Sequence, residues 1–138
     1  MNLAILIVEG DELALSNLRK ALPLKIASSW KKGDVRRNGK SHTLPGFSAT
    51  IADVANPGEL TRAILTFLKQ CKERGVSFTK TGVSAELSLG VTVGDSQQFV
   101  AGVQLSPSDL SLFAEHGLTL SVTAYPTSDD ANVVRRAT

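Results

Sequence analysis

The sequence has few of the residues that build covalent frameworks or metal sites. It holds one cysteine and two histidines in 138 residues, which excludes both an internal disulfide and a four-cysteine zinc site. Paired ligand spacings such as Cys-x-x-Cys or His-x-x-x-His do not occur, so we expect neither a metal nor another cofactor. A single cysteine is typical of a reducing compartment, and we expect a cytoplasmic protein.

Long apolar runs and the common catalytic motifs are also lacking. The longest apolar run, Leu3–Val8, has six residues, whereas a membrane-spanning helix needs about 20. The Gly-x-Ser-x-Gly pattern of a serine nucleophile does not occur. The turn Glu9-Gly10-Asp11 has two acids that would repel a phosphate. The sequence therefore predicts no membrane span, no secretory signal and no enzyme.

The remaining candidates for chemistry are isolated side chains. Cys71 falls on the apolar stripe of a predicted helix, where burial would raise the pKa of its thiol and make it a poor nucleophile. His116 follows another predicted helix and is expected to cap it. His42 lies in a basic loop and is more open to a role.

Apolar periodicity predicts most of the secondary structure. The unbroken run Leu3–Val8 is typical of a central strand that is covered on both faces. Capping residues before apolar stripes, Asn56 with Pro57 and Ser106 with Pro107, mark the starts of two helices. Helices are predicted over 11–22, 57–74 and 107–116, and strands over 3–8, 24–30, 47–51, 83–93, 99–105 and 118–124, with 83–93 and 99–105 as an antiparallel hairpin.

These elements predict an α+β fold. Strands that alternate between apolar and polar residues need cover on one face only, and each helix has one apolar stripe to bury. We expect a two-layer sandwich, with a mixed and mainly antiparallel sheet of five to six strands and three helices on one face. Residues 1–126 would form this single domain, and 127–138 a flexible C-terminal tail.

Basic residues cluster in one segment of the chain. The whole sequence has a net charge of +2, but between Arg19 and His42 the only acid, Asp34, stands among eight basic residues: Arg19, Lys20, Lys25, Lys31, Lys32, Arg36, Arg37 and Lys40. The stretch 31–46 is predicted as a long irregular loop, unless it hides a two-stranded ribbon. Such a charge asymmetry orients encounters with an anionic partner.

Several hypotheses explain this segment. The leading one is a non-catalytic protein-binding domain that docks on an acidic protein surface through Trp30, Lys31, Lys32, Asp34, Arg36 and Arg37. In the alternatives the loop binds single-stranded nucleic acid, with an indole that stacks on a base, or His42 and Asp34 act as acid and base in a small enzyme. A purely structural ribbon, in which Trp30 covers the sheet edge and Asp34 pairs with a lysine, accounts for the same residues. A homo-oligomer, formed through an exposed strand or the hydroxyl-rich sheet face, is a further alternative.

Two stretches of the chain carry a family resemblance. The first is Trp30-Lys31-Lys32-Gly33-Asp34 with the following loop and Phe47-Ser48, and the second runs from Leu105-Ser106-Pro107 through Leu110, Phe113, Gly117 and Leu118 to Tyr125-Pro126. Together they resemble a family of small bacterial proteins that is catalogued as a domain of unknown function. That family often has Trp-Ser where this chain has Phe47-Ser48. The resemblance implies a bacterial, cytoplasmic α+β domain, and by analogy with immunity proteins of similar build, a toxin-neutralising role.

Overall fold

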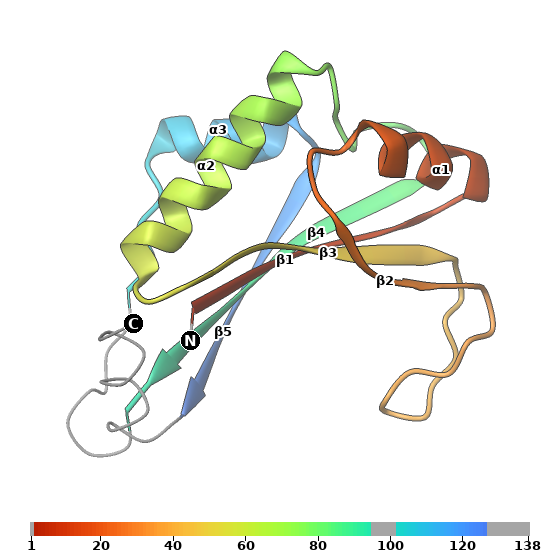
Figure 1. The fold of residues 1–138 in the computed structure, drawn as a ribbon, viewed down its shortest axis with the longest axis horizontal. Helices are drawn as coiled ribbons and strands as arrows, with labels where there is room; N and C mark the ends of the chain where they lie inside the picture. The colour runs from red at the N-terminus through yellow and green to blue at the C-terminus, as the bar shows by residue number, and fades with distance from the viewer. Residues whose placement is uncertain (1, 95–101, 127–138) are drawn as a thin grey trace.

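A computed structural model describes residues 2–94 and 102–126 of the chain. The predicted C-terminal tail, 127–138, lies outside these residues. Five strands form one sheet, and three helices pack on one of its faces (Figure 1). The elements are β1 (Asn2–Gly10), α1 (Glu12–Ala21), β2 (Ile26–Trp30), β3 (Gly46–Val54), α2 (Pro57–Glu73), β4 (Val83–Val93), α3 (Pro107–Glu115) and β5 (Leu118–Pro126).

The sheet is mixed and mostly antiparallel. Its strand order is β2-β3-β1-β4-β5, so β1 lies in the middle as predicted. The strand β1 pairs antiparallel with both β3 and β4, β2 pairs antiparallel with β3, and β5 pairs parallel to β4. Because parallel neighbours require a crossover, α3 connects β4 to β5 over the helical face. The predicted α+β class, with three helices on one face, is confirmed.

The hydrophobic core lies between this sheet and the helices. On β1 the residues Ala4, Leu6 and Val8 are fully buried, and every second residue of β4 from Ala85 to Val91 is buried beside them. The predicted apolar stripe of α2 packs on these strands with the side chains Leu60, Ile64, Phe67, Leu68 and Cys71. This burial is what fixes the register of the strands, since a slip of one residue would turn the apolar set outward.

No helix in the described part of the chain covers the second face of the sheet, which corrects the prediction for β1. Along β1, buried residues alternate with half-buried ones. Leu3, Ile5 and Ile7 are half-buried on this second face, which we call the open face. Their neighbours on β3 and β4, such as Ser48 and Ser88, are polar. A continuous apolar run therefore indicates here a central position in the sheet and not cover on both faces.

The predicted hairpin between 83–93 and 99–105 is wrong for the part of it that the structure describes. Residues 102–105 form no strand, and 99–101 lie outside the described residues. The strand β4 already has β1 along one edge and β5 along the other. A strand has only two edges, so the alternation in 99–105 had no free edge of β4 on which to pair.

Polar caps fix the helix starts as predicted. The side chain of Asn56 accepts a hydrogen bond from the Glu59 backbone at 2.9 Å. At α3, Ser106 and Asp109 form a reciprocal capping box. Each cap satisfies backbone N–H groups that the first helical turn leaves without partners.

Candidate functional site: a basic hairpin beside the open sheet face

The segment between β2 and β3 folds into a small hairpin, which we name the basic hairpin (residues 31–42). Its two arms pair through Arg36 N to Lys40 O at 2.7 Å and His42 N to Asp34 O at 2.8 Å. Gly39, with φ of +82°, supplies the left-handed residue that closes the turn. The ribbon that the sequence left open is thus present. It projects on the side of the sheet opposite the helices (Figure 1).

The base of the hairpin is a turn held by Asp34. The backbone N–H of Lys31 donates to Asp34 Oδ2 at 2.8 Å, and the backbone N–H of Asp34 donates to Lys31 O at 3.1 Å. The hypothesis of a purely structural ribbon paired the Asp34 carboxylate with a lysine side chain. In the structure this carboxylate accepts a hydrogen bond from the Lys31 backbone instead. The one acid of the hairpin therefore shapes its turn.

Trp30 ties the hairpin to the end of the sheet. Its ring stacks on His42, with centroids 4.6 Å apart and planes 18° from parallel. The indole also lies against Gly46 of β3, where an added Cβ would come within 2.6 Å of Cζ2. Its Nε1 is buried and has no partner among the described residues. Packing therefore holds the indole in place.

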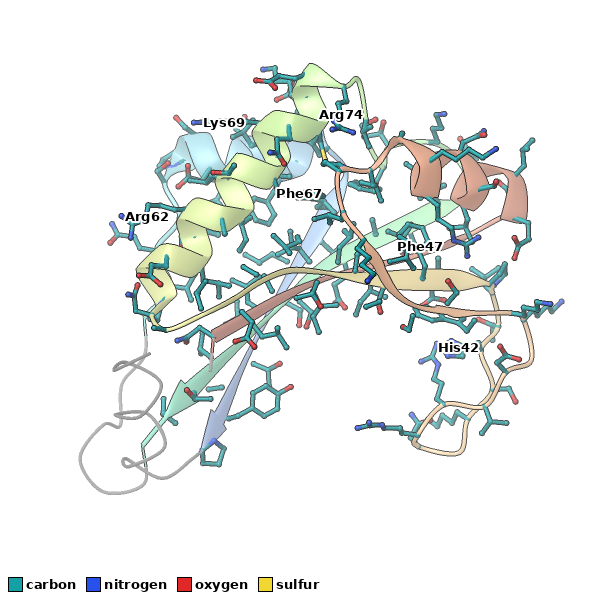
Figure 2. All side chains as sticks on the ribbon, viewed as in Figure 1. His42, Phe47, Arg62, Phe67, Lys69 and Arg74 are labelled. Atoms are coloured by element: carbon teal, nitrogen blue, oxygen red, sulfur yellow. The ribbon has the colours of Figure 1, made fainter. Side chains whose placement is uncertain are left out.

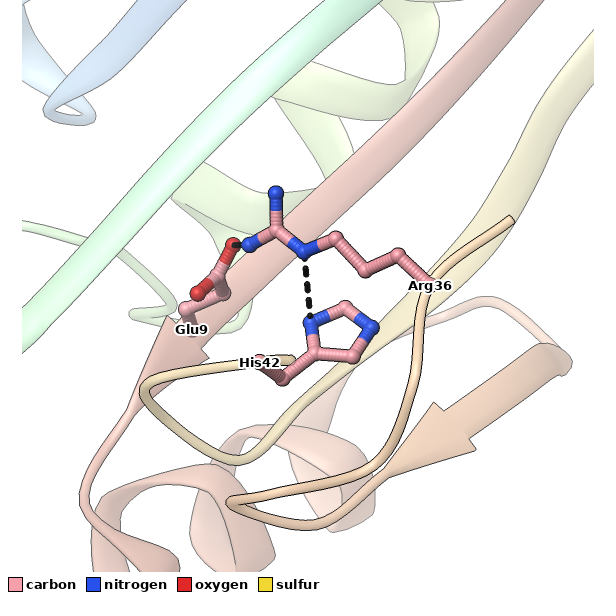
Figure 3. Close-up of polar contacts among 3 residues, drawn as sticks. All are labelled: Glu9, Arg36 and His42. Carbon is pink, nitrogen blue, oxygen red and sulfur yellow. Dashed lines mark hydrogen bonds and ion pairs between the residues drawn. The ribbon is translucent and has the colours of Figure 1, made fainter. Parts of the chain in front are cut away.

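Arg36 makes a second connection between the hairpin and the sheet (Figure 3). Its Nε donates to His42 Nδ1 at 3.3 Å, and its Nη2 lies 3.9 Å from Glu9 Oε1. Glu9 stands on the open face at the end of β1. The contacts from Glu9 through Arg36 and His42 to Trp30 thus link the end of β1 to the end of β2 through the hairpin.

The other cations of the hairpin point to solvent. Lys32, Arg37 and Lys40 are exposed and form no ion pair with any residue that the structure describes. Lys31 is also exposed and lies at the base of the hairpin. The hairpin therefore presents uncompensated positive charge.

A hollow of about 380 Å³ lies beside the base of the hairpin, between it and α1. It is lined by Glu12, Arg19, Ser29, Trp30, Lys31 and Asp34. His42 does not line it, so this hollow does not bring together the imidazole and carboxylate of the enzyme hypothesis. Its charged residues are of both signs.

The remaining chemical candidates are structural in their surroundings. Cys71 is fully buried. Burial raises the pKa of its thiol more than the nearby charge of Arg74 lowers it, so the pKa moves from 9.0 to about 11. His116 is buried, and its Nδ1 lies 2.8 Å from Leu112 O at the end of α3, in agreement with the predicted cap. Within 2–94 and 102–126, no group of three or more potential ligands could hold a metal ion.

None of the helices among the described residues is long and apolar enough to cross a membrane. Comparison of the chain with protein-family models, with curated proteins and with solved structures gave no match.

Sequence reasoning found the basic segment but missed two of its supports, Glu9 and Gly46. Neither has a local signal, because each matters only through a contact made across the sheet. The turn did have a signal: Asn38-Gly39 between two short arms is typical of a hairpin.

Proposed function

We propose that this protein is a non-catalytic binding domain that docks on an acidic protein surface through the basic hairpin. The observation that carries the proposal is that Lys32, Arg37 and Lys40 are exposed without ion pairs to described residues, on a hairpin that a ring stack and an ion pair fasten to the sheet. Because the hairpin backbone is already ordered, binding through it costs little backbone conformational entropy. The exposed cations also accelerate the encounter with a surface of opposite charge.

The surroundings of Trp30 support a protein partner over a single-stranded nucleic acid. Binding of single strands relies on aromatic rings that are free to stack on bases. Here His42 covers one face of the indole, and the ring also packs against Gly46. In this proposal Trp30 supports the hairpin, while Lys31, Lys32, Arg36 and Arg37 supply the field that steers association.

The kind of partner follows from the charge pattern. An acidic protein that must be bound quickly and held, as a toxin is held by an immunity protein, fits a rigid basic projection. This role is the one that the sequence analysis drew by analogy with immunity proteins of similar build. The proposed domain binds its partner and carries out no reaction on it.

Affinity capture from the lysate of the source organism tests the proposal. We would compare the native protein with a triple variant, Lys32→Glu, Arg37→Glu and Lys40→Glu, with and without nuclease treatment. The native protein should retain a protein with an acidic surface, in a manner that weakens with salt, and the triple variant should lose it. Purified partner and native protein should then associate at least about tenfold faster than partner and variant at low ionic strength.

The matched control reverses three exposed lysines away from the hairpin: Lys20, Lys69 and Lys80. Both variants have the same net charge and differ only in where the changed residues lie. If the hairpin binds the partner, only the hairpin variant should lose it. Equal retention by all three proteins would reject the proposal. A bound species that nuclease removes would replace it with the nucleic-acid alternative.

A further inference from the structure

Within residues 2–94 and 102–126, the outer edge of β5 has none of the features that usually protect an edge strand. Of the residues that the structure describes, only those of β4 pair with β5, so its second edge has no strand beside it. The strand runs for nine residues without a register shift. It contains no charged residue, and its only proline is the last residue. A long, uncharged and regular edge is a template for another strand.

The opposite edge of the sheet shows the contrast. The strand β2 has five residues and an irregularity between Ile26 and Ser28. Lys25 precedes it and Lys31 follows it. Short length, a bulge and flanking lysines are the ordinary means by which sheet edges avoid pairing. Among the residues that the structure places, one edge of this sheet is therefore protected and the other is not.

The helical face of β5 is also only half covered. Leu118, beside α3, has 9% of its surface exposed, whereas Val122 has 50% exposed. From Val122 to Pro126 every residue is exposed. The short helix α3 thus covers the first half of β5 and leaves apolar side chains of the second half in solvent.

We propose that β5 pairs antiparallel with β5 of a second copy of this chain, across a twofold axis at Val122. The two sheets would join into one of ten strands. In this register Ser121 lies opposite the partner's Thr123, and Leu120 lies opposite the partner's Ala124. Hydroxyl groups thus face hydroxyl groups on the open face, and apolar groups face apolar groups on the helical face.

The second copy fits this edge for two reasons. The strand has no charge, so self-pairing sets no like charges opposite each other. Antiparallel pairing also places the half of each strand that α3 covers beside the uncovered half of the other strand. Each helix then lies next to the partner's exposed Val122 and Ala124. The nine residue pairs would add about eight main-chain hydrogen bonds, since Pro126 has no N–H to donate.

This interface is independent of the basic hairpin. The hairpin follows β2, and β2 and β5 are at opposite edges of the sheet. The dimer would keep both hairpins free.

Sedimentation velocity over a wide range of protein concentration tests the proposal. The native chain should reach twice its mass of 14.6 kDa. Val122→Lys should abolish the dimer, because two ammonium groups would meet at the twofold axis. Leu13→Lys is the control, since Leu13 is 73% exposed on α1, and this variant should remain a dimer. A native chain that stays monomeric at every concentration would overturn the proposal.

A cysteine at the axis provides a second test that does not depend on charge. Val122→Cys should form a disulfide-linked dimer with oxidised glutathione, while Leu13→Cys should not. The native thiol, Cys71, is fully buried and does not compete. A dimer that forms no crosslink at Val122→Cys and survives Val122→Lys would place the interface elsewhere and reject the pairing through β5.

Discussion

Gly46 lies where β1, β3 and Trp30 come together. A Cβ at this position would be 2.5 Å from Val8 O and 2.6 Å from Trp30 Cζ2, closer than atoms approach. The indole can lie on the sheet only because this residue has no side chain. The absence of a Cβ at Gly46 therefore allows Trp30, and with it the base of the hairpin, to pack against the sheet.

Gly46→Ala should destabilise the fold by about 1–3 kcal/mol, since β1, β3 and the indole must all shift to accept the methyl group. Urea unfolding measures this loss. Gly58→Ala in the first turn of α2 is the control, where the nearest atom would be 3.4 Å away. If both variants unfold at the same urea concentration, the close packing around Gly46 is not as described.

Cys71 gives the stability of the protein a dependence on alkaline pH. Burial raises the pKa of this thiol from 9.0 to about 11. Between these values the folded protein keeps the thiol proton and the unfolded chain loses it, so stability falls as pH rises through this window. Below pH 9.0 the thiol is protonated in both states and makes no such difference.

Cys71→Ala isolates this effect from the titration of other groups. The variant should be less stable than the native protein below pH 9, because it leaves a small cavity. Its disadvantage should shrink as pH rises toward 11, as measured by urea unfolding at each pH. Parallel stability curves for the two proteins would show that the native thiol is not buried in this way.

At the scale of elements, the stack of His42 on Trp30 and the ion pair of Arg36 with Glu9 attach the basic hairpin to the sheet, while backbone hydrogen bonds hold its two arms together. His42 takes part in both connections, through its ring with Trp30 and through Nδ1 with Arg36 (Figure 3). The rest of the hairpin, from Lys31 to Ser41, is exposed. Loss of the imidazole should therefore loosen the hairpin and leave the core intact.

His42→Ala should shift the fluorescence emission of Trp30 to longer wavelength and speed tryptic cleavage at Arg36 and Arg37. Trp30 is the only tryptophan, so the signal reports this site alone. Global stability should change by less than about 1.5 kcal/mol. Ser41→Ala, in the same hairpin, is the control and should change neither signal. Unchanged emission in His42→Ala would contradict the stacked arrangement.

Patterns within single elements predicted much of this fold, and pairings between elements were harder to obtain. The stripe of α2 and the alternation of β4 specify which face is buried, because burial of a face depends on local spacing. They do not specify a neighbour, so 99–105 was paired with β4 when β1 and β5 occupy its edges. The positive charge of the hairpin could be predicted because its basic residues are close together in the sequence. The contact of Arg36 with Glu9 could not, because it forms only when the sheet is complete.

At the scale of the whole molecule, a small net charge conceals a strong asymmetry. The overall charge is +2, yet five of the basic residues lie in the exposed hairpin on one side of the sheet (Figure 2). A surface of opposite charge should therefore meet the molecule in one orientation.

Retention on a cation-exchange column measures this orientation without a partner. The triple variant at Lys32, Arg37 and Lys40 should elute at much lower salt than the variant at Lys20, Lys69 and Lys80, although the two carry equal charge. Retention depends on local charge density when one patch faces the resin. Elution of both variants at the same salt concentration would contradict the prediction that the hairpin orients the molecule toward a negatively charged surface.

The central place of β1 also has a consequence for biosynthesis. Asn2–Gly10 finds one of its two neighbours in Val83–Val91, so the ribosome must add about 80 further residues before the middle of the sheet can close. At roughly 5–20 residues per second, this wait lasts several seconds or more. During this time Leu3–Val8, the longest apolar run of the chain, cannot pair with β4. A chaperone that binds Leu3–Val8 should therefore raise the yield of native protein.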